Sequence, residues 1–298
     1  MKLCRYVEDR PGQAGGDDRL GLVEGDEVLD VTGALDVIPA QRWPIAPGDP
    51  LILNLERVTA RIETLAASAP RRKLSAVKLK SPIANPGKIV NAPINYQAHI
   101  DEAKKDQGIA HGRDLSKGIW DWGLFLKATS ALIGPGEEIR LRFPERRNDH
   151  EVELAVIIGK RCNHVKKEDA LQCVAGYAIG LDMTIRGPEL PSFRKSPDTY
   201  AVCGPWLVTK DEIPDPNNLD LSLRVNGELC QNSNTKRLVY NVERLIEYAT
   251  SFYTLHPGDL IFTGTPEGVG PIKPGDLITA EIERIGRFEI RVAAAYDQ

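Results

Sequence analysis

The stretch that decides the fold is His150–Lys160, which reads HEVELAVIIGK. Valine, isoleucine and leucine dominate this stretch, so it is predicted to form a β-strand. Successive side chains of a strand point to opposite faces, so Glu151 and Glu153 share one face. Two neighbouring carboxylates repel each other, and burying them without partners is costly. A positive group is therefore expected between them.

A divalent cation such as Mg²⁺ meets this requirement, because it prefers oxygen ligands in octahedral geometry. Asp182 is the candidate for a third carboxylate ligand, since it follows another small and apolar run, Ala175–Leu181. The alternative is that Glu151 and Glu153 lie on a solvated strand face and pair with lysine or arginine. The apolar residues in both runs count against a solvated face, although spacing alone leaves this alternative open.

The overall composition excludes several classes of protein. The chain has 298 residues, of which 42% are hydrophobic and 27% charged, so collagen-like, coiled-coil and largely disordered chains are excluded. Its formal net charge of −4 argues against nucleic acid as the main partner. No secretory signal is visible at the start, and no apolar run approaches the ~20 residues that span a bilayer. Because the apolar runs are so short, we expect no membrane partner. The 5 cysteines form no CxxC pair, so we expect them to be thiols in a reducing cytoplasm.

Residues 1–80 differ in pattern from residues 81–298, and we place a domain boundary near residue 80. Leu20–Val31 alternates apolar and polar residues around a Gly-Asp pair, which predicts a β-hairpin. Apolar residues recur at three- and four-residue steps over Leu51–Ala66, which predicts a helix with one apolar face. Ser68–Lys80 is rich in arginine and lysine and poor in core residues, so it is interpreted as a solvated linker.

The remainder of the chain is rich in predicted strands and turns. A Pro-Gly-acid turn recurs at residues 135–137, 257–259 and 274–276, and the order of proline and glycine suits a type II turn. One clear late helix is expected over Asn241–Phe252, with Asn241 as its cap. Short strands with few helices between them favour a folded β-sheet core over a parallel doubly wound sheet. The glycine-rich segment 264–270 lacks the lysine of a phosphate-binding loop.

Taken together, the motifs resemble those of the fumarylacetoacetate hydrolase family. The matching segments keep the family's order over roughly residues 90–298: NYQAHIDE (95–102), FLKAT (125–129), EVELAVIIGK (151–160), AGYAIGLDMTIR (175–186), RKSPDTY (194–200), GPWLV (204–208), VNGELCQ (225–231) and GDLIFTGTPEGVG (258–270). The resemblance implies a β-rich α+β fold, namely a mixed β-sandwich roll of the family's C-terminal catalytic type with a small N-terminal α+β domain, usually as a homodimer. It also implies Mg²⁺ or Mn²⁺ bound by Glu151, Glu153 and Asp182.

Several positions depart from the family's pattern. Leu181 and Thr184 stand where the family usually has asparagine and serine beside the metal aspartate. Arg194 replaces a glycine before the lysine of the later motif, and Pro197 replaces an aromatic residue. The stretch between Glu102 and Phe125 is longer than in many members and contains Trp120 and Trp122. These changes concern the substrate more than the metal, and the two tryptophans are expected to shape the far side of the pocket.

His99 and Glu102 are the candidates for activating water. Three residues apart on a helix, they are neighbours on one face, so Glu102 could orient the imidazole while His99 takes a proton from water. The resemblance places this pair on a lid segment over the metal, and His99 could therefore be poorly placed until the lid closes.

The resemblance also assigns residues around the substrate. Lys127 and Lys195 match positive positions near the metal, where Lys195 is expected to take part in catalysis. Arg186 suits a substrate carboxylate, although an ion pair with a nearby acid explains it nearly as well. The backbone N–H groups of Gly264 and Thr265 could hold a carboxylate, or the glycine could simply close a tight turn. Asn95 and Tyr96, which open the NYQAHIDE motif, complete the predicted substrate-binding set.

The leading hypothesis is a metal-dependent hydrolase that cleaves the C–C bond of an acylpyruvate or related 2,4-dioxo acid. Such a reaction breaks a bond beside a carbonyl, and a bound metal ion would stabilise the enolate that results. The alternative on the same fold is a decarboxylase or a tautomerase (isomerase) of a 2-oxo acid, which needs no activated water. A catalytically inactive ligand-binding protein should lack the acid trio or the His–Glu pair, and both are present.

Overall fold

The computed structural model describes residues 1–8, 17–112, 114 and 116–294. Its largest sheet within these residues has the strand order β4-β3-β2-β1-β14-β12-β11-β17-β6-β7, with β5 paired to β1 and β8 to β14. Pairing in this sheet is antiparallel except for β14 with β8 and β17 with β6. The strands are β1 (Lys2–Val7), β2 (Arg19–Glu24), β3 (Glu27–Asp30), β4 (Arg71–Lys73), β5 (Lys78–Lys80), β6 (Ile89–Asn91), β7 (Phe125–Lys127), β8 (Leu132–Ile133), β11 (Val152–Ile158), β12 (Val174–Asp182), β14 (Ala201–Thr209) and β17 (Leu260–Phe262).

Two smaller sheets complete the β-structure of the described residues. One has the order β16-β15-β19-β20-β9, and the other has the order β13-β10-β18. Their strands are β9 (Glu138–Arg140), β10 (Asn148–His150), β13 (Thr184–Ile185), β15 (Asp220–Val225), β16 (Glu228–Asn234), β18 (Gly270–Pro271), β19 (Leu277–Ile282) and β20 (Gly286–Ala293). The prediction of a folded β-sheet core in place of a doubly wound parallel sheet is therefore confirmed.

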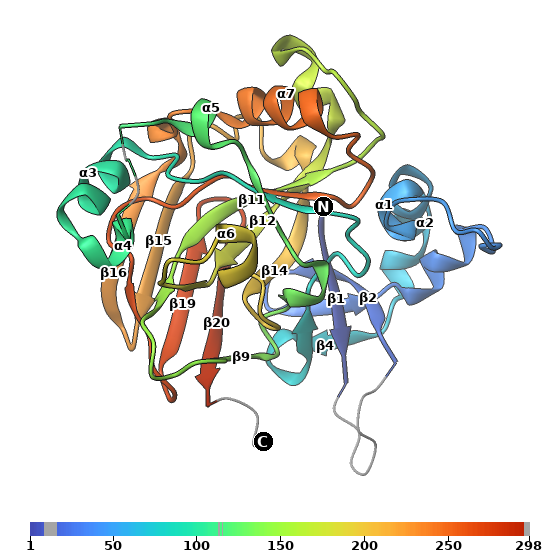
Figure 1. Ribbon diagram of the computed structural model, residues 1–298. Coiled ribbons are helices and arrows are strands. Elements are labelled where there is room, and N and C mark those ends of the chain that lie inside the picture. Colours follow the sequence, from blue (N-terminus) through green and yellow to red (C-terminus); the bar gives the residue numbers. More distant parts are fainter. Residues whose placement is uncertain (9–16, 113, 115, 295–298) are drawn as a thin grey trace.

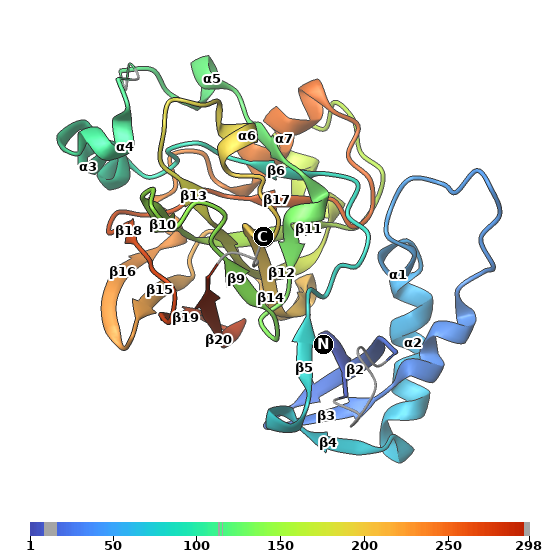
Figure 2. The same ribbon diagram turned by 60° about the horizontal axis from the view of Figure 1, so that its bottom comes forward.

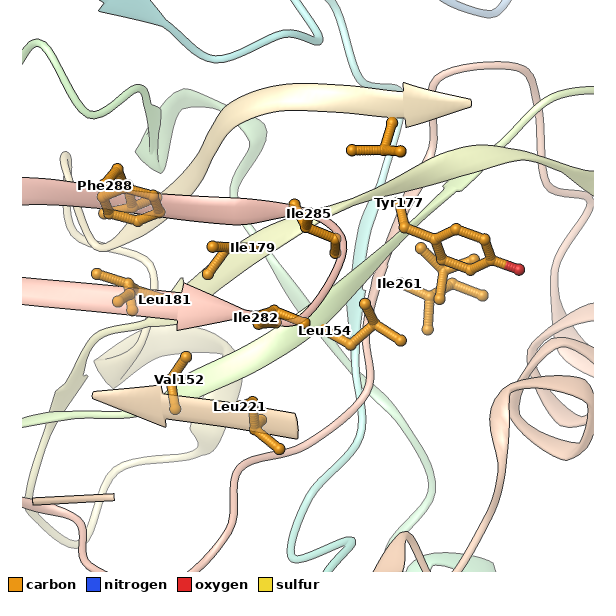
Figure 3. Packing of buried hydrophobic residues seen from close by; sticks show 14 of the residues in the cluster. Val152, Leu154, Tyr177, Ile179, Leu181, Leu221, Ile261, Ile282, Ile285 and Phe288 are labelled. Atoms are coloured by element: carbon orange, nitrogen blue, oxygen red, sulfur yellow. The ribbon is translucent and has the colours of Figure 1, made fainter. Parts of the chain in front are cut away.

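The main core lies between the long sheet and the sheet that contains β15, β19 and β20. Val152 and Leu154 of β11 point into this core, where they belong to the same buried cluster as Leu221 and Ile282 of the facing sheet (Figure 3). Ala155 and Ile157 belong to a second cluster on the opposite face of the long sheet. Because side chains alternate along a strand, Glu151 and Glu153 share the face of Ala155 and Ile157, as the sequence predicted.

The N-terminal helices cover the second cluster. Val58 and Ile62 of α2 (Leu55–Leu65) are fully buried in it. The predicted helix over residues 51–66 is divided at Asn54, which separates α2 from α1 (Pro50–Leu53). Asp49 caps α1 by accepting hydrogen bonds from the N–H groups of the second and third residues after it.

The interpretation of residues 68–80 as a solvated linker was wrong. This segment contributes β4, which pairs with β3, and β5, which pairs with β1. Its basic side chains meet acids on neighbouring segments: Arg71 pairs with Glu24 and Glu27, and Lys73 with Asp26. The charge that suggested a linker therefore lies along edge strands, where lysine and arginine are common. The hairpin at 20–31 is confirmed as β2 and β3.

The remaining α-helices are α3 (Gln97–Lys105), α4 (Gln107–Ala110), α5 (Ile119–Trp122), α6 (Pro191–Arg194) and α7 (Val242–Phe252). The predicted late helix is confirmed as α7, with Asn241 as its cap. Gly258 and Gly275 have the positive φ angles of 86° and 95° that a type II turn needs at its third position. Gly136 is not among the glycines with positive φ, so the type II assignment was wrong for the turn at 135–137.

In both views α3 and α4 lie at one side of the molecule, and α1 and α2 lie at the other (Figures 1 and 2). The N-terminal strands nevertheless continue the long sheet, because β1 pairs with β14. The domain boundary near residue 80 stays a prediction. In the described part of the chain, no helix combines the length and the apolar character needed to cross a bilayer.

Candidate active site

The centre of the site is a cluster of carboxylates at the end of β11 and β12. Antiparallel pairing places Asp182 opposite Glu151, whose carbonyl accepts a hydrogen bond of 2.9 Å from the Asp182 N–H. One oxygen from each of Glu151, Glu153 and Asp182 lies within 4.8 Å of the others. The side chains are buried, with residue exposures of 3%, 1% and 1%. The strand face is therefore not solvated, and the structure brings the predicted trio together.

Buried cations neutralise two members of this cluster. Lys195 Nζ lies 2.7 Å from Glu151 Oε2 and 2.6 Å from Asp182 Oδ2, and Lys127 also pairs with Asp182. Arg186 Nη2 lies 2.9 Å from Glu151 Oε1. Burial alone would raise the pKa of Glu151, but Lys195 and Arg186 hold that pKa below its ordinary value. The pairing with lysine and arginine that the sequence left open is therefore present, but in a buried setting.

Glu153 is the member that points to a further cation. Its Oε2 accepts a hydrogen bond of 2.6 Å from the Gly264 N–H, and it has no ion pair with any described residue. Burial raises the pKa of Glu153 well above its ordinary value, and the nearby charge of Asp182 adds to this effect. A buried, all-oxygen donor set with an unbalanced carboxylate fits Mg²⁺ or Mn²⁺.

His99 of α3 lines the same cavity, and Glu102 of the same helix contacts His99. His99 Nδ1 lies 2.8 Å from Glu102 Oε2. The imidazole is almost fully buried, as are Glu151 and Glu153 across the cavity. Glu102 Oε1 accepts a second hydrogen bond, of 2.9 Å, from the Gly268 N–H in the loop after β17. The pair is therefore formed and docked on the body of the protein in this structure, with Nε2 as the nitrogen left to accept a proton.

A chain of ion pairs that the sequence analysis missed joins this helical segment to the acid cluster. Arg147 contacts Asp106, the cap of α4, and Asp149, each at 2.8 Å. Arg186 Nε contacts the other oxygen of Asp149 at 2.7 Å and then reaches Glu151. The alternation Asp149-x-Glu151-x-Glu153 was a signal for Asp149, since it continues the same two-residue period.

Of the other predicted site residues, some line the cavity and others do not. Arg186, Lys195 and Thr265 line the cavity beside His99, Glu151 and Glu153, whereas Lys127 is buried behind Asp182. Gly264 requires its left-handed conformation, since its φ is +98° and an added Cβ would lie 2.6 Å from the Asn95 Cβ.

Asn95 and Tyr96 are almost fully buried and do not line the cavity. The amide of Asn95 donates to the carbonyls of Tyr240 and Thr263 and accepts from the Tyr240 N–H, so it ties the NYQAHIDE motif to two other segments. The Tyr96 hydroxyl is buried and has no hydrogen-bond partner among the described residues. Burial raises the pKa of Tyr96, and the charge of Glu153 adds to it. Neither residue lines the cavity, so their contact with substrate stays a prediction.

Gln231 also holds the site and was missed by the sequence analysis. Its Oε1 accepts from the Val152 N–H, and its Nε2 donates to Thr265 Oγ1 at 2.8 Å. Thr265 in turn donates to the Val152 carbonyl. This network fixes the loop after β17 to the start of β11. Gln231 belongs to the quoted motif VNGELCQ, which was the available signal.

The cavity has an empty volume of about 650 Å³, including space open to solvent. Its outer wall contains Ile109, Trp122, Phe125 and Pro191. Trp120 does not line the cavity; it stacks on Tyr248 of α7, with ring centroids 4.9 Å apart. Of the two tryptophans expected to shape the pocket, only Trp122 is in position to do so.

Residues 88–293 match the family model described as "Fumarylacetoacetate (FAA) hydrolase C-terminal". Among curated relatives, a maleylpyruvate hydrolase of Aquipseudomonas alcaligenes is 56% identical over 98% of this chain and 99% of its own. A mitochondrial oxaloacetate tautomerase of Bos taurus is 38% identical over 96% of this chain and 90% of its own.

A solved structure shows the same similarity at the level of the fold. The crystal structure of maleylpyruvate hydrolase from Sphingobium sp. SYK-6, in complex with manganese(II) and pyruvate, superposes with a TM-score of 0.81. Its sequence is 40% identical, and the match covers 99% of this chain and 100% of that one. The similarity therefore extends over the β-roll, the N-terminal segment and the helices around the cavity.

Proposed function

Because this chain belongs to the fumarylacetoacetate hydrolase family, we propose that it is a metal-dependent hydrolase that cleaves the C–C bond of maleylpyruvate or a close acylpyruvate. The observation that carries the proposal is the meeting of two groups in one cavity. Glu151 and Glu153 belong to the buried acid cluster, while His99 with Glu102 supplies a base. The similarity to maleylpyruvate hydrolases over nearly the whole chain supports the same reaction.

The reaction adds water across a carbon–carbon bond. Maleylpyruvate and water give maleate and pyruvate: the water oxygen bonds to the acyl carbonyl carbon, and the bond to the adjacent methylene breaks. The bonding electrons remain on the pyruvyl fragment as an enolate, which then takes a proton at the methylene carbon. When bound at Glu151, Glu153 and Asp182, a divalent cation supplies Lewis-acid stabilisation of this enolate.

In this proposal the chain's own residues hold and move the protons. His99 accepts a proton from water at Nε2, and Glu102 stabilises the imidazolium through the 2.8 Å contact at Nδ1. Lys195 stands between Glu151 and Asp182, where its ammonium can turn toward a developing oxyanion. Arg186 holds Glu151 in position through its ion pair, and contact of Arg186 with substrate stays a prediction.

Product analysis tests the reaction directly. Purified protein with Mn²⁺ should convert maleylpyruvate to equal amounts of pyruvate and maleate, detected by proton NMR. Chelation of the metal with EDTA should abolish the conversion, and added Mn²⁺ or Mg²⁺ should restore it. Formation of CO₂, or full activity in the chelated protein, would contradict the proposal.

A tautomerase is the second candidate, because a relative with 38% identity is named as an oxaloacetate tautomerase. Tautomerisation moves a proton without adding water, so oxaloacetate should exchange its methylene hydrogens while its carbon skeleton stays intact. NMR in D₂O distinguishes this outcome from hydrolysis in the same sample. Two further proposals rest on the family: that the chain forms a homodimer, which sedimentation would test, and that it works in the cytoplasm.

A further inference from the structure

The cavity wall contains a residue whose backbone conformation is unfavourable for its type. Among the described residues, six other than glycine have a positive φ angle: Ile94, His111, His164, Thr199, Asn226 and Arg284. Asparagine and histidine adopt this left-handed conformation more readily than most residues, whereas a β-branched residue in it is a genuine outlier. The two β-branched members are Ile94, with a φ of 38°, and Thr199, with a φ of 72°. Of the six, only Ile94 lines the cavity.

Ile94 lies in the bend that joins β6 to α3, and hydrogen bonds on both sides fix this bend. Before it, the Ala92 N–H donates to the Phe262 carbonyl at 3.0 Å. After it, Asn95 Nδ2 donates to the Thr263 carbonyl at 2.7 Å. These anchors hold Ile94 in a conformation that its own side chain opposes. Such strain persists only where the surrounding structure over-determines it.

The side chain distinguishes Ile94 from a residue that fits the bend better. A glycine or an asparagine would make the same bend at a lower cost. Either would remove the branched apolar side chain from the cavity wall, where Ile94 is half-buried and follows Ala92 and Pro93. Strained residues of this kind cluster at functional sites. The observation therefore directs attention to what the side chain of Ile94 contacts in the cavity.

The bend is packed against the loop that holds Glu153. This loop follows β17 and continues from Thr263 into Gly264, whose N–H donates to Glu153 Oε2 at 2.6 Å. The two segments are so close that a Cβ on Gly264 would lie 2.6 Å from the Asn95 Cβ. Ile94 precedes Asn95 and lines the cavity together with Glu153. It therefore contributes an apolar group to the wall near the acid cluster.

We propose that Ile94 forms the apolar wall against the methylene of the pyruvyl group, and that its strained backbone is retained because it directs a branched apolar side chain to this position. The inference rests on the proposed function, which places the pyruvyl group at the acid cluster. The carboxylate and carbonyl oxygens of that group suit the cations and the metal site, whereas its methylene suits an apolar partner. In the product the same carbon is the methyl group of pyruvate, so pyruvate itself is a probe of the contact.

Calorimetry with pyruvate tests this contact without relying on turnover. In the Mn²⁺-loaded protein, Ile94→Asn should weaken pyruvate binding by about 10-fold, the effect commonly found for one apolar contact in a pocket. For maleylpyruvate, KM should rise by about 10-fold while kcat stays within about twofold, because the contact is made equally in the ground and transition states. Ile94→Val keeps a branched side chain, so its pyruvate binding should stay within about twofold of the wild type.

The strain gives a second readout that a purely structural role would not produce. Asparagine suits a left-handed backbone better than isoleucine, so Ile94→Asn should raise the melting temperature of the ligand-free protein by about 2 °C. Arg284→Asn is the matched control, since Arg284 has a φ of 62° in the turn between β19 and β20, outside the cavity. It should leave pyruvate binding and KM unchanged.

Unchanged pyruvate binding in Ile94→Asn would overturn the inference, and so would the absence of pyruvate binding by the wild type. A fall in kcat together with a lower melting temperature would also overturn it, because that result is expected if Ile94 only supports α3. If the wild type binds pyruvate but does not hydrolyse maleylpyruvate, the proposed function fails. The pyruvate affinities of Ile94→Asn and Ile94→Val then decide on Ile94 alone.

Discussion

The acid cluster and the helical segment that faces it are built in different ways. Glu151, Glu153 and Asp182 lie at the ends of central strands and are almost fully buried. The facing segment includes three short helices among its described residues (97–112, 114 and 116–122) and is fixed to the body by contacts such as Glu102–Gly268 and Asp106–Arg147. The acid cluster is therefore fixed by the central sheet, and we expect the segment that faces it to be the part that opens for substrate.

The largest expected effect comes from removing a carboxylate from the acid cluster. Glu153→Gln keeps the size of the side chain but loses its charge, so kcat/KM should fall by about 10³-fold or more. Removing one of a group of mutually repelling carboxylates should not lower the melting temperature of the metal-free protein. Steady-state kinetics measures kcat/KM, and differential scanning calorimetry measures the melting temperature. A variant that keeps wild-type kcat/KM would show that the acid cluster is not the metal site.

The second largest loss of activity is expected from a change at His99, on the helical segment. His99→Ala removes the proposed base, and kcat for hydrolysis should fall by about 10²–10⁴-fold. Hydrogen exchange at the methyl group of bound pyruvate should survive, because it does not need activated water. His164→Ala is the control, since His164 lies outside the cavity and contacts Asn163. Retention of hydrolysis in His99→Ala would show that His99 is not the base that activates water.

An intermediate effect should follow from cutting the connection between the two regions. Arg147→Gln breaks both the contact with Asp106 on the helical segment and the contact with Asp149 near the acid cluster. We expect about a 10-fold loss in kcat/KM, the size commonly found for residues that orient metal ligands. Faster proteolysis within residues 97–122 should accompany it. Asp106→Asn, which disturbs only the outer contact, should accelerate proteolysis but affect kcat/KM less.

The smallest effects separate the two tryptophans. Trp122 lines the cavity, so Trp122→Ala should raise KM by a few-fold, by loss of apolar contact with the acyl group. Trp120 stacks on Tyr248, so Trp120→Ala should leave KM unchanged and lower the free energy of unfolding by about 1 kcal/mol. Urea titration measures the second effect. The opposite assignment of the two effects would mean that the helical segment binds substrate in another conformation.

The sequence predicted the site residues that follow a local period better than those that join distant segments, for a physical reason. Glu151 and Glu153 follow the two-residue period of a strand, a local pattern that can be read without knowledge of the fold. The Glu102–His99 pair likewise follows the local spacing of a helix. The roles of Gln231 and Arg147 depend on segments far apart in the chain, so no local period shows them.

The same reasoning explains the error over residues 68–80. β4 and β5 have three residues each, which is too short for a strand period to stand out, and their pairing partners lie in β3 and β1. Composition alone therefore suggested a linker. Arg194 was noticed in the sequence as a departure from the family, but its burial in the cavity wall became visible only in the folded chain.

The most direct test of the division between the two regions is a Mn²⁺ titration of metal-free protein by isothermal calorimetry. The wild type and His99→Ala should each bind one Mn²⁺ per chain with similar affinity, although His99→Ala should hydrolyse maleylpyruvate far more slowly. Glu153→Ala should show no binding at the same concentrations. Normal Mn²⁺ binding by Glu153→Ala, or its loss in His99→Ala, would contradict the account.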